Sequence, residues 1–195
     1  MPFCILVFLS FPLFARESSF TDLLAPKVTP PGDNETCFSP DEPCAAKLDR
    51  FMQSAEKTLD IAIYSINLEN VVDTLIKKND KTKIRIVVDK VQAHGAKSRV
   101  RQLLEGGVNV RYGKQKGIMH NKFVIVDHRM LETGSFNYTN HASIANQENQ
   151  IYLANPQIVM RYVERFEWIW ENSVEINLPE LIREIEREHT THDKY

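Results

Sequence analysis

The sequence predicts an α/β protein of one domain, built on a mixed, largely parallel β-sheet with helices on both faces. From residue 39 onward, short apolar runs of strand length alternate with segments whose apolar residues recur at helical spacing. A β-α-β-α-β order with short connections implies parallel strands that are covered by helices. The 195 residues are enough for one domain with a sizeable core, and the 43% hydrophobic and 26% charged residues are typical of a globular protein.

The first half of the predicted domain (39–175) begins with a helix. We expect Ser39 to be its N-cap, Pro40 its first helical residue and Glu42 the closing residue of a capping box, with the helix running to about Lys57. The next predicted elements are strands at 59–65, 83–89 and 108–112 and helices at 68–78 and 97–105, the last ended by Gly106-Gly107. The strand at 83–89 is mostly apolar, as expected for a central strand.

The second half of the domain is predicted to contain three further strands and a long helix. The strands are expected at 122–126, near 130–133 and at 148–154, and the helix begins at Asn155-Pro156 and runs to about Glu171. The apolar residues of this helix are more simply explained as core than as a cofactor site. The last segment, 176–195, is predicted to hold a charged amphipathic helix at 180–188, to which the sequence assigns no role.

A polar motif of the form H-x-K-x4-D frames the apolar strand 122–126. Side chains alternate across a strand, so His120 and Lys122 project from one face and Asp127 from the other. An imidazole beside an ammonium suits an anionic group, because Lys122 can neutralise phosphate charge while His120 acts as nucleophile or general acid. We interpret Asp127 as a structural carboxylate. Its opposite face and the neighbouring lysine disfavour a metal site with His120, and the sequence has no zinc-type cluster of Cys and His.

A second motif, G-S-x-N, begins seven residues after Asp127. Gly134 allows a close approach of the backbone, and the Ser135 hydroxyl and Asn137 amide share a face and can hydrogen-bond phosphate oxygens. For Ser135 in particular, a simple turn is the alternative interpretation. Glu148 lies just before the next predicted strand. It is a candidate partner for the second ring nitrogen of His120, where it would fix the tautomer, with a solvated surface carboxylate as the alternative.

The combination of HNKFVIVD, GSFN and NQEN resembles the phospholipase D superfamily, and in particular its small bacterial endonucleases, which carry one H-x-K motif per chain. The resemblance covers roughly residues 38–172. It implies the phospholipase D-like fold and a two-step phosphodiester hydrolysis through a phosphohistidine that needs no metal and no cofactor. The chain has one motif and no internal repeat, so by analogy two chains pair across a two-fold axis, and each gives one His120 and one Lys122 to a shared site.

The net charge of −2 does not indicate a nucleic-acid-binding protein, but the distribution of the charges does. Residues 83–122 contain ten Lys and Arg against two Asp and Glu, and residues 161–195 contain five against nine. The basic half leads directly into the strand of the H-x-K motif and predicts a groove that holds a polyanion. The candidates to line it are Arg99, Arg101, Arg111, Lys114 and Lys116.

The N-terminal residues 1–15 are apolar and uncharged, which is typical of the hydrophobic core of a signal peptide with cleavage after Ala15. An uncleaved anchor is the alternative, although the run is shorter than the ~20 residues of a membrane-spanning helix and contains Pro2 and Pro12. Residues 16–38 are rich in proline and lack periodicity, so we expect a linker. The sequence thus predicts an exported protein, periplasmic or secreted, with no stable membrane span.

Once the leader is removed, Cys37 and Cys44 are the remaining cysteines. In an exported protein they are expected to form a disulfide that ties the linker to the first helix, and two reduced thiols are the alternative.

The substrate follows less directly from the sequence than the chemistry does. The small single-motif chain, the basic segment and the absence of an apolar loop that docks on lipid favour a nuclease acting on DNA and/or RNA. A phospholipase or cardiolipin-type hydrolase would use the same catalytic residues. A nucleic-acid-binding module without activity is the third hypothesis, which the complete residue set disfavours.

Overall fold

The computed structural model describes residues 34–113 and 116–192, with side chains up to residue 187. The strands are β1 (Glu35–Ser39), β2 (Thr58–Ile63), β3 (Lys83–Val88), β4 (Asn109–Gly113), β5 (Lys122–Val126), β6 (Met130–Gly134), β7 (Glu148–Leu153) and β8 (Ser173–Glu175). The helices are α1 (Cys44–Gln53), α2 (Glu69–Lys78), α3 (Lys90–His94), α4 (Val100–Glu105), α5 (Asn140–Ile144), α6 (Pro156–Glu171) and α7 (Leu178–His192).

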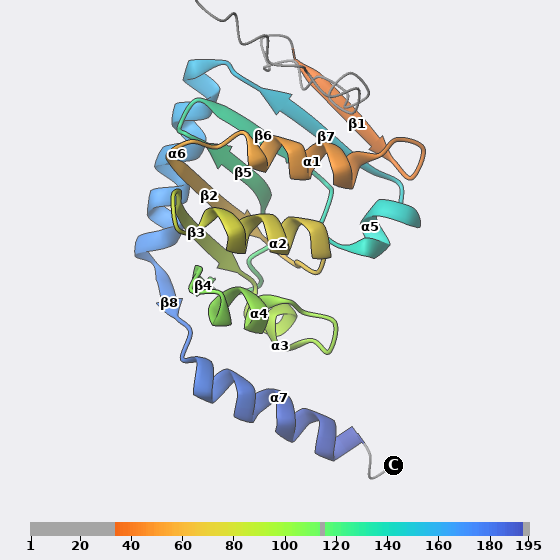
Figure 1. Ribbon diagram of the computed structural model, residues 1–195, viewed down its shortest axis with the longest axis vertical. Coiled ribbons are helices and arrows are strands. Elements are labelled where there is room, and N and C mark those ends of the chain that lie inside the picture. Colours follow the sequence, from red (N-terminus) through yellow and green to blue (C-terminus); the bar gives the residue numbers. More distant parts are fainter. Residues whose placement is uncertain (1–33, 114–115, 193–195) are drawn as a thin grey trace, which may run out of the picture.

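All eight strands belong to one mixed sheet in the order β1-β7-β6-β5-β2-β3-β4-β8. Helices α1, α2 and α4 lie on one face of the sheet, and α6 packs on the other (Figure 1). The prediction of one domain with a mixed sheet and helices on both faces is therefore confirmed.

The sheet is parallel only in its β2-β3-β4 part, and every other pairing is antiparallel. The α2 and α3–α4 crossovers explain the parallel pairs, as the sequence predicts. After β4, however, the chain returns beside β2 as β5 and continues through the β5-β6-β7 meander. The expectation of a largely parallel sheet is thus too broad, because two of the seven pairings among the described strands are parallel.

The centre of the sheet is buried on both faces. Every residue of β5 is buried, and its side chains alternate between two apolar layers. Val124 and Val126 pack with α1 and α2, while Phe123 and Ile125 pack with α6. Burial of each such side chain contributes about 1.5–3 kcal/mol, so this strand holds the residues just before it in a fixed position.

The predicted start of the first helix is wrong. Ser39 ends β1, and a turn at 40–42 precedes α1, whose N-cap is Pro43. The Ser39 hydroxyl donates to the carbonyl of Ala142 in α5 instead of capping α1. Local sequence favours the capping box, but the pairing of β1 with β7, more than a hundred residues away, overrides it.

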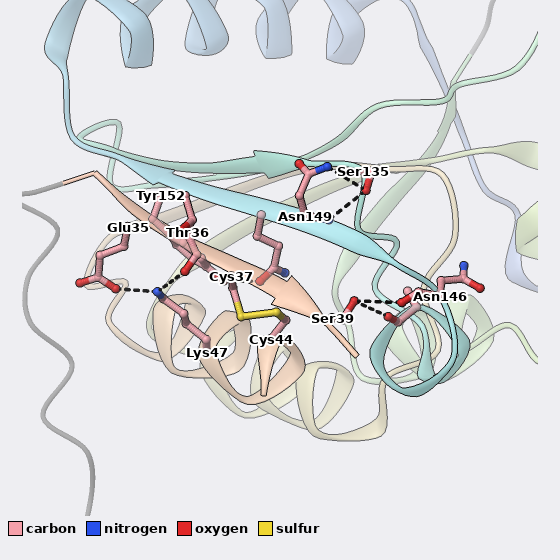
Figure 2. The surroundings of a disulfide bond; sticks show 12 residues. Glu35, Thr36, Cys37, Ser39, Cys44, Lys47, Ser135, Asn146, Asn149 and Tyr152 are labelled. Atoms are coloured by element: carbon pink, nitrogen blue, oxygen red, sulfur yellow. Dashed lines mark hydrogen bonds and ion pairs between the residues drawn. A yellow bond between two sulfur atoms is a disulfide. The ribbon is translucent and has the colours of Figure 1, made fainter. Parts of the chain in front are cut away.

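The end of the predicted linker is an ordered part of the sheet. Residues 35–38, assigned to the linker, lie in β1, and Figure 2 shows the Cys37–Cys44 disulfide joining this strand to α1. Lys47 of α1 adds an ion pair to Glu35 at 2.7 Å and donates to the carbonyl of Thr36. These contacts attach the edge strand to the body of the domain.

Helix α7 extends from β8 and packs on α3 and α4 (Figure 1). Leu181 is buried at this contact, and Glu184 pairs with Nε2 of His94 at 2.6 Å. Within the part of the chain that the structure describes, no helix is both long enough and apolar enough to cross a membrane. The predicted signal peptide and most of the predicted linker lie outside the described residues.

Candidate active site

The H-x-K motif lies at one end of the central strands, where β2 ends and β5 begins. We call this end of the strands the motif edge of the sheet. Lys122 is the first residue of β5 and is paired with Ile63, the last residue of the antiparallel β2. The residues that follow β2 therefore come back to the motif. Tyr64 N–H donates to the carbonyl of Asn121, which extends the strand pairing by one step to the position beside His120.

Tyr64 contacts both motif side chains and so places them on the same side of the strand. Its ring meets the His120 ring edge-on, with 4.6 Å between the centroids, and the Lys122 Nζ lies 5.1 Å from the centroid of the tyrosine ring. Lys122 Nζ also donates to the carbonyl of His120 at 2.9 Å. The imidazole is exposed, whereas Lys122 is only 8% exposed. A reachable imidazole thus lies beside a buried ammonium.

The environment of Lys122 strengthens the attraction between its ammonium group and an anion. Burial lowers the pKa of the ammonium below its ordinary value, and the negative charge of Glu148 partly offsets this effect. An ammonium with few water neighbours interacts more strongly with an anion than a solvated one, because the local dielectric is lower. This position suits a cation that binds one phosphate group.

The G-S-x-N segment follows β6 and lies against β7. A Cβ atom at Gly134 would overlap the Asn149 carbonyl, so the close backbone approach requires glycine. The Ser135 hydroxyl donates to Glu148. It also accepts from the backbone N–H of Asn149 (Figure 2). In the loop that follows, Phe136 is fully buried and Asn137 is partly buried.

Asn137 has an unusual environment for an amide. Its Oδ1 is buried, and among the described residues no hydrogen bond reaches this atom. A buried polar atom without a partner costs about 1–3 kcal/mol, which folded proteins seldom tolerate without a functional reason. Tyr138, the next residue, is fully buried and its hydroxyl donates to Glu132 of β6 at 2.8 Å. This hydrogen bond attaches the loop that carries Asn137 to the sheet.

Within the described chain, Glu148 has other partners than His120, the candidate that the sequence suggests. The Glu148 carboxylate accepts from the Ser135 hydroxyl and from the Asn146 side chain. The strand order gives the reason: β7 is separated from β5 by β6, so a residue at the start of β7 first meets the end of β6. Glu148 instead acts on Lys122 through its charge and holds Ser135 in place.

Asp127 lies at the far end of β5 from His120, and its contacts are those of a structural residue. Its carboxylate accepts from the backbone N–H groups of residues 56, 57 and 58 at 2.7–2.9 Å. Burial raises the pKa of this carboxyl group, but the three backbone bonds outweigh burial and keep the pKa below its ordinary value. The carboxylate thus fixes β5 to the turn before β2, which agrees with the interpretation from the sequence.

Of the five basic residues of the predicted groove, the structure describes four, and two of these are paired with acidic side chains. Arg111 is opposite Glu175 in the β4–β8 pairing, binds it at 2.9 Å and lies over the Trp170 ring. Arg101 pairs with Glu105 one helical turn away. Arg99 lines a hollow beside the G-S-x-N loop, and Lys116 is exposed. Lys114 lies outside the described residues.

The sequence analysis missed three polar residues at this edge of the sheet. Tyr64 touches both motif side chains, and Lys97 and His141 line the same hollow as Arg99. For Tyr64 a signal exists: it follows a predicted parallel strand, and the carboxyl ends of such strands meet the functional edge of an α/β sheet. Lys97 and His141 have no comparable signal, because only the fold brings their segments together.

Two groups of metal-ligating side chains occur among the described residues. Cys37 and Cys44, near Glu42, are joined as a disulfide, so their sulfurs are not thiolate ligands. The second group, Asp60, His128 and Glu167, surrounds the Arg85 guanidinium, which pairs with both carboxylates. This second group lies at the opposite end of β5 from His120. Neither group contains His120 or Lys122. The chemistry predicted from the sequence assigns no step to a metal or cofactor.

Comparison with known proteins places this geometry in a family. The family model described as "Cardiolipin synthase, PLD-like domain" matches residues 48–170. The mitochondrial cardiolipin hydrolase of Chlamydomonas reinhardtii is 33% identical over 162 residues, which cover 70% of this chain and 73% of that protein. A phospholipase D of Rickettsia felis is 28% identical over 152 residues, or 77% of this chain and 73% of the relative.

Among solved structures, the phospholipase D family member Nuc from Salmonella typhimurium has the same fold. The superposition has a TM-score of 0.70 at 23% identity and covers 74% of this chain and 98% of Nuc. The matched region contains β2 to β7, and therefore both motifs and the strands that position them. This chain belongs to the phospholipase D superfamily and is a phosphodiester-cleaving hydrolase of that superfamily.

Proposed function

We propose that this protein is an exported endonuclease that cleaves DNA and/or RNA through a phosphohistidine, without a metal, in an active site shared by two copies of the chain. The observation that carries the proposal is the placement of an exposed His120 beside a buried Lys122, both against Tyr64, at the edge of the sheet. An accessible imidazole nucleophile next to a fixed cation is the arrangement that attack on a phosphodiester requires.

In the first step, a ring nitrogen of one His120 attacks phosphorus and the bond to the leaving oxygen breaks. The His120 of the second copy gives its proton to that oxygen. In the second step this now neutral imidazole takes a proton from water, the water oxygen attacks phosphorus, and the N–P bond breaks. The Lys122 ammonium and the Asn137 amide of each copy stabilise the charge on the five-coordinate phosphorus, and Ser135 binds a phosphate oxygen.

The need for two histidines supports the homodimer. Each chain supplies one imidazole at the motif, whereas the reaction needs a nucleophile and a general acid in opposite protonation states. A two-fold axis near His120 would bring a second imidazole to the same phosphate without any further residue from the chain. The exposed position of His120 at the edge of the sheet is compatible with this pairing.

Nucleic acid is favoured as the substrate by basic side chains near the motif that no acidic residue neutralises. Lys97, Arg99 and His141 line a hollow close to the G-S-x-N loop, and no ion pair involves them within the described segments. A phosphate backbone presents repeated charges to such a surface.

A cardiolipin-type hydrolase is the second candidate. It is supported by the names of the sequence relatives and by exposed apolar residues at the same edge of the sheet, Val91, Ile118 and Ile144, which the sequence analysis did not expect.

Export is supported by the Cys37–Cys44 disulfide, because disulfides persist in oxidising compartments.

The test is digestion of plasmid DNA, single-stranded RNA and cardiolipin in detergent micelles by purified residues 16–195 in excess EDTA. His120→Asn is the inactive variant, and His128→Asn, at the far end of β5, is the matched control. We expect cleavage of a nucleic acid by the wild type and by His128→Asn, and none by His120→Asn. Cleavage of cardiolipin alone, or full nuclease activity in His120→Asn, would contradict the proposal.

The shared site has its own test. When wild type is refolded with an excess of His120→Asn, most wild-type chains enter mixed dimers that hold one histidine at the site. Activity should then fall much further than dilution alone predicts. Activity proportional to the wild-type fraction would refute the shared site.

A further inference from the structure

A hollow of about 570 Å³ lies between α5 and the loop that joins α3 to α4. One wall is formed by residues 96–99 of that loop, the other by residues 140–145, and Asn67 lies between them. The lining contains three basic side chains, Lys97, Arg99 and His141, and an apolar side chain, Ile144, that is 76% exposed. The hollow thus combines basic side chains with apolar surface, and no step of the mechanism proposed above uses it.

The walls of the hollow are held in place by hydrogen bonds between segments that are distant in sequence. The backbone N–H of Arg99 donates to the carbonyl of Ile66, and the backbone N–H of Asn140 donates to the Asn67 side chain at 2.9 Å. Asn67 N–H in turn donates to the carbonyl of Tyr138. The basic side chains therefore project from a framework that exists before any ligand arrives, which reduces the entropy cost of binding.

The basic residues of the hollow differ from other arginines of the domain in having no acidic partner. Arg85, Arg101 and Arg111 each bind at least one carboxylate. For Lys97, Arg99 and His141, in contrast, the described residues provide no ion pair and no side-chain hydrogen bond to a carboxylate. Positive charge that is concentrated around a concave surface and left uncompensated favours an anionic ligand.

The hollow lies next to the catalytic motif along both of its walls. Tyr64, which touches His120, is three residues before Asn67, so their Cα atoms are at most about 11 Å apart. The same limit applies to Asn137 and Asn140. A ligand that places one phosphate at His120 and Lys122 can therefore reach the hollow with an adjacent group.

We propose that this hollow is a subsite for the neighbouring phosphate of the same nucleic acid strand, with Lys97, Arg99 and His141 as its ligands and Ile144 as the contact for the attached sugar or base. This inference rests on the proposed nuclease function and deepens it. It makes the preferred substrate an oligonucleotide with at least two phosphodiester groups in a flexible single strand. A strand is favoured over a lipid because three basic side chains line the hollow, whereas Ile144 is the one large apolar side chain among the described residues of its lining.

The experiment compares thymidine dinucleotide (TpT), which has one phosphodiester, with the trinucleotide (TpTpT), which has two. The variant is Arg99→Ala, and the matched control is Arg101→Ala, which removes an exposed arginine that pairs only within α4. We expect the wild type and Arg101→Ala to cleave TpTpT with a kcat/KM about tenfold above that for TpT, the gain of one charge-assisted contact. Arg99→Ala should lose this gain through a higher KM for TpTpT.

Binding provides a readout that does not depend on turnover. Fluorescein-labelled TpTpT is titrated into His120→Asn with and without Arg99→Ala, at several salt concentrations. Adding Arg99→Ala to His120→Asn should weaken binding of TpTpT about tenfold. It should also reduce the slope of log Kd against log salt by about 0.7, the value for one phosphate contact of a single strand.

The outcomes separate the subsite from the catalytic function. Loss of the second-phosphate gain in Arg99→Ala alone supports the subsite. Equal wild-type activity on TpT and TpTpT, together with equal binding of TpTpT by His120→Asn with and without Arg99→Ala, overturns the subsite. The proposed nuclease function is not affected by that result. Cleavage of neither, together with a preference for cardiolipin over phosphatidylglycerol in micelles that Arg99→Ala abolishes, overturns the nucleic acid assignment, because the second phosphate is then that of a lipid.

Discussion

Replacing Glu132 by Gln is expected to remove a large pH dependence of the stability of this fold. Glu132 lies in β6, is fully buried, and accepts a hydrogen bond from the Tyr138 hydroxyl, which fixes the loop of Asn137. Burial raises the pKa of the carboxyl group to about 8, although the hydrogen bond from Tyr138 opposes this shift. The carboxyl group is therefore protonated at neutral pH in the folded protein.

The magnitude follows from linkage between protonation and folding. The ordinary pKa of this group is 4.5, and a difference of one pKa unit between folded and unfolded states corresponds to about 1.4 kcal/mol. The folded state binds the proton more tightly than the unfolded chain does. The contribution is therefore fully present below about pH 4.5 and is lost as the pH rises through about 8. The total loss amounts to about 5 kcal/mol.

The assay is urea unfolding of wild type and Glu132→Gln between pH 4.5 and pH 9, at one protein concentration and with the disulfide intact. Gln has nearly the same shape and no titrating proton, so the wild type should lose free energy of unfolding relative to the variant across this range. Glu105→Gln, at an exposed carboxylate that pairs with Arg101, is the control and should run parallel to the wild type. A free-energy difference between wild type and Glu132→Gln that is constant with pH would refute the reasoning.

Three further changes address the residues around the motif. Gly134→Ala should destabilise the fold by about 1–3 kcal/mol in urea unfolding and reduce kcat, because the new methyl group overlaps the Asn149 carbonyl and displaces the G-S-x-N loop. Asp127→Asn should lower the free energy of unfolding by about 1–3 kcal/mol at pH 7 with little change in KM, because the group fixes backbone N–H groups far from His120; a selective loss of kcat would contradict this role. Glu148→Gln removes the charge that raises the pKa of Lys122, so the alkaline limb of the pH–rate profile should move to lower pH, and an unchanged limb would exclude the coupling.

Features that depend on local sequence were predictable, and the strand of the motif shows why. Lys122, the four apolar residues 123–126 that follow it and the alternation of their faces predict β5 with its observed bounds, and Asn155-Pro156 predicts the start of α6. The same alternation predicts that His120 and Lys122 share a face, which their common contact with Tyr64 bears out. In each case the information lies within a few residues of the chain.

Features that depend on pairing between distant segments were not predictable. Ser39 has the sequence of a helix cap but ends a strand, because β1 pairs with β7. Arg111 was expected in a groove but binds Glu175, which the β4–β8 pairing places opposite it. Glu148 was assigned to His120, and the position of β6 between their strands gives it to Ser135 instead. None of these partners has a signal in the neighbouring sequence.

The hydrogen-bonding capacity that remains at the motif is compatible with the proposed site shared by two chains. The buried sheet, Tyr64 and the fixed loop of Asn137 hold the functional groups before substrate binds. Within the described chain, however, Lys122 uses one of its three protons, Asn137 Oδ1 has no partner, and no hydrogen bond reaches the ring nitrogens of His120. These groups lie where β2 ends and β5 begins. The exposed imidazole is solvated, so the cost of a buried atom without a partner falls on Asn137 Oδ1, which only a donor group can satisfy. A site that is rigid in its framework and incomplete in its contacts is what a shared, two-fold active site requires of each chain.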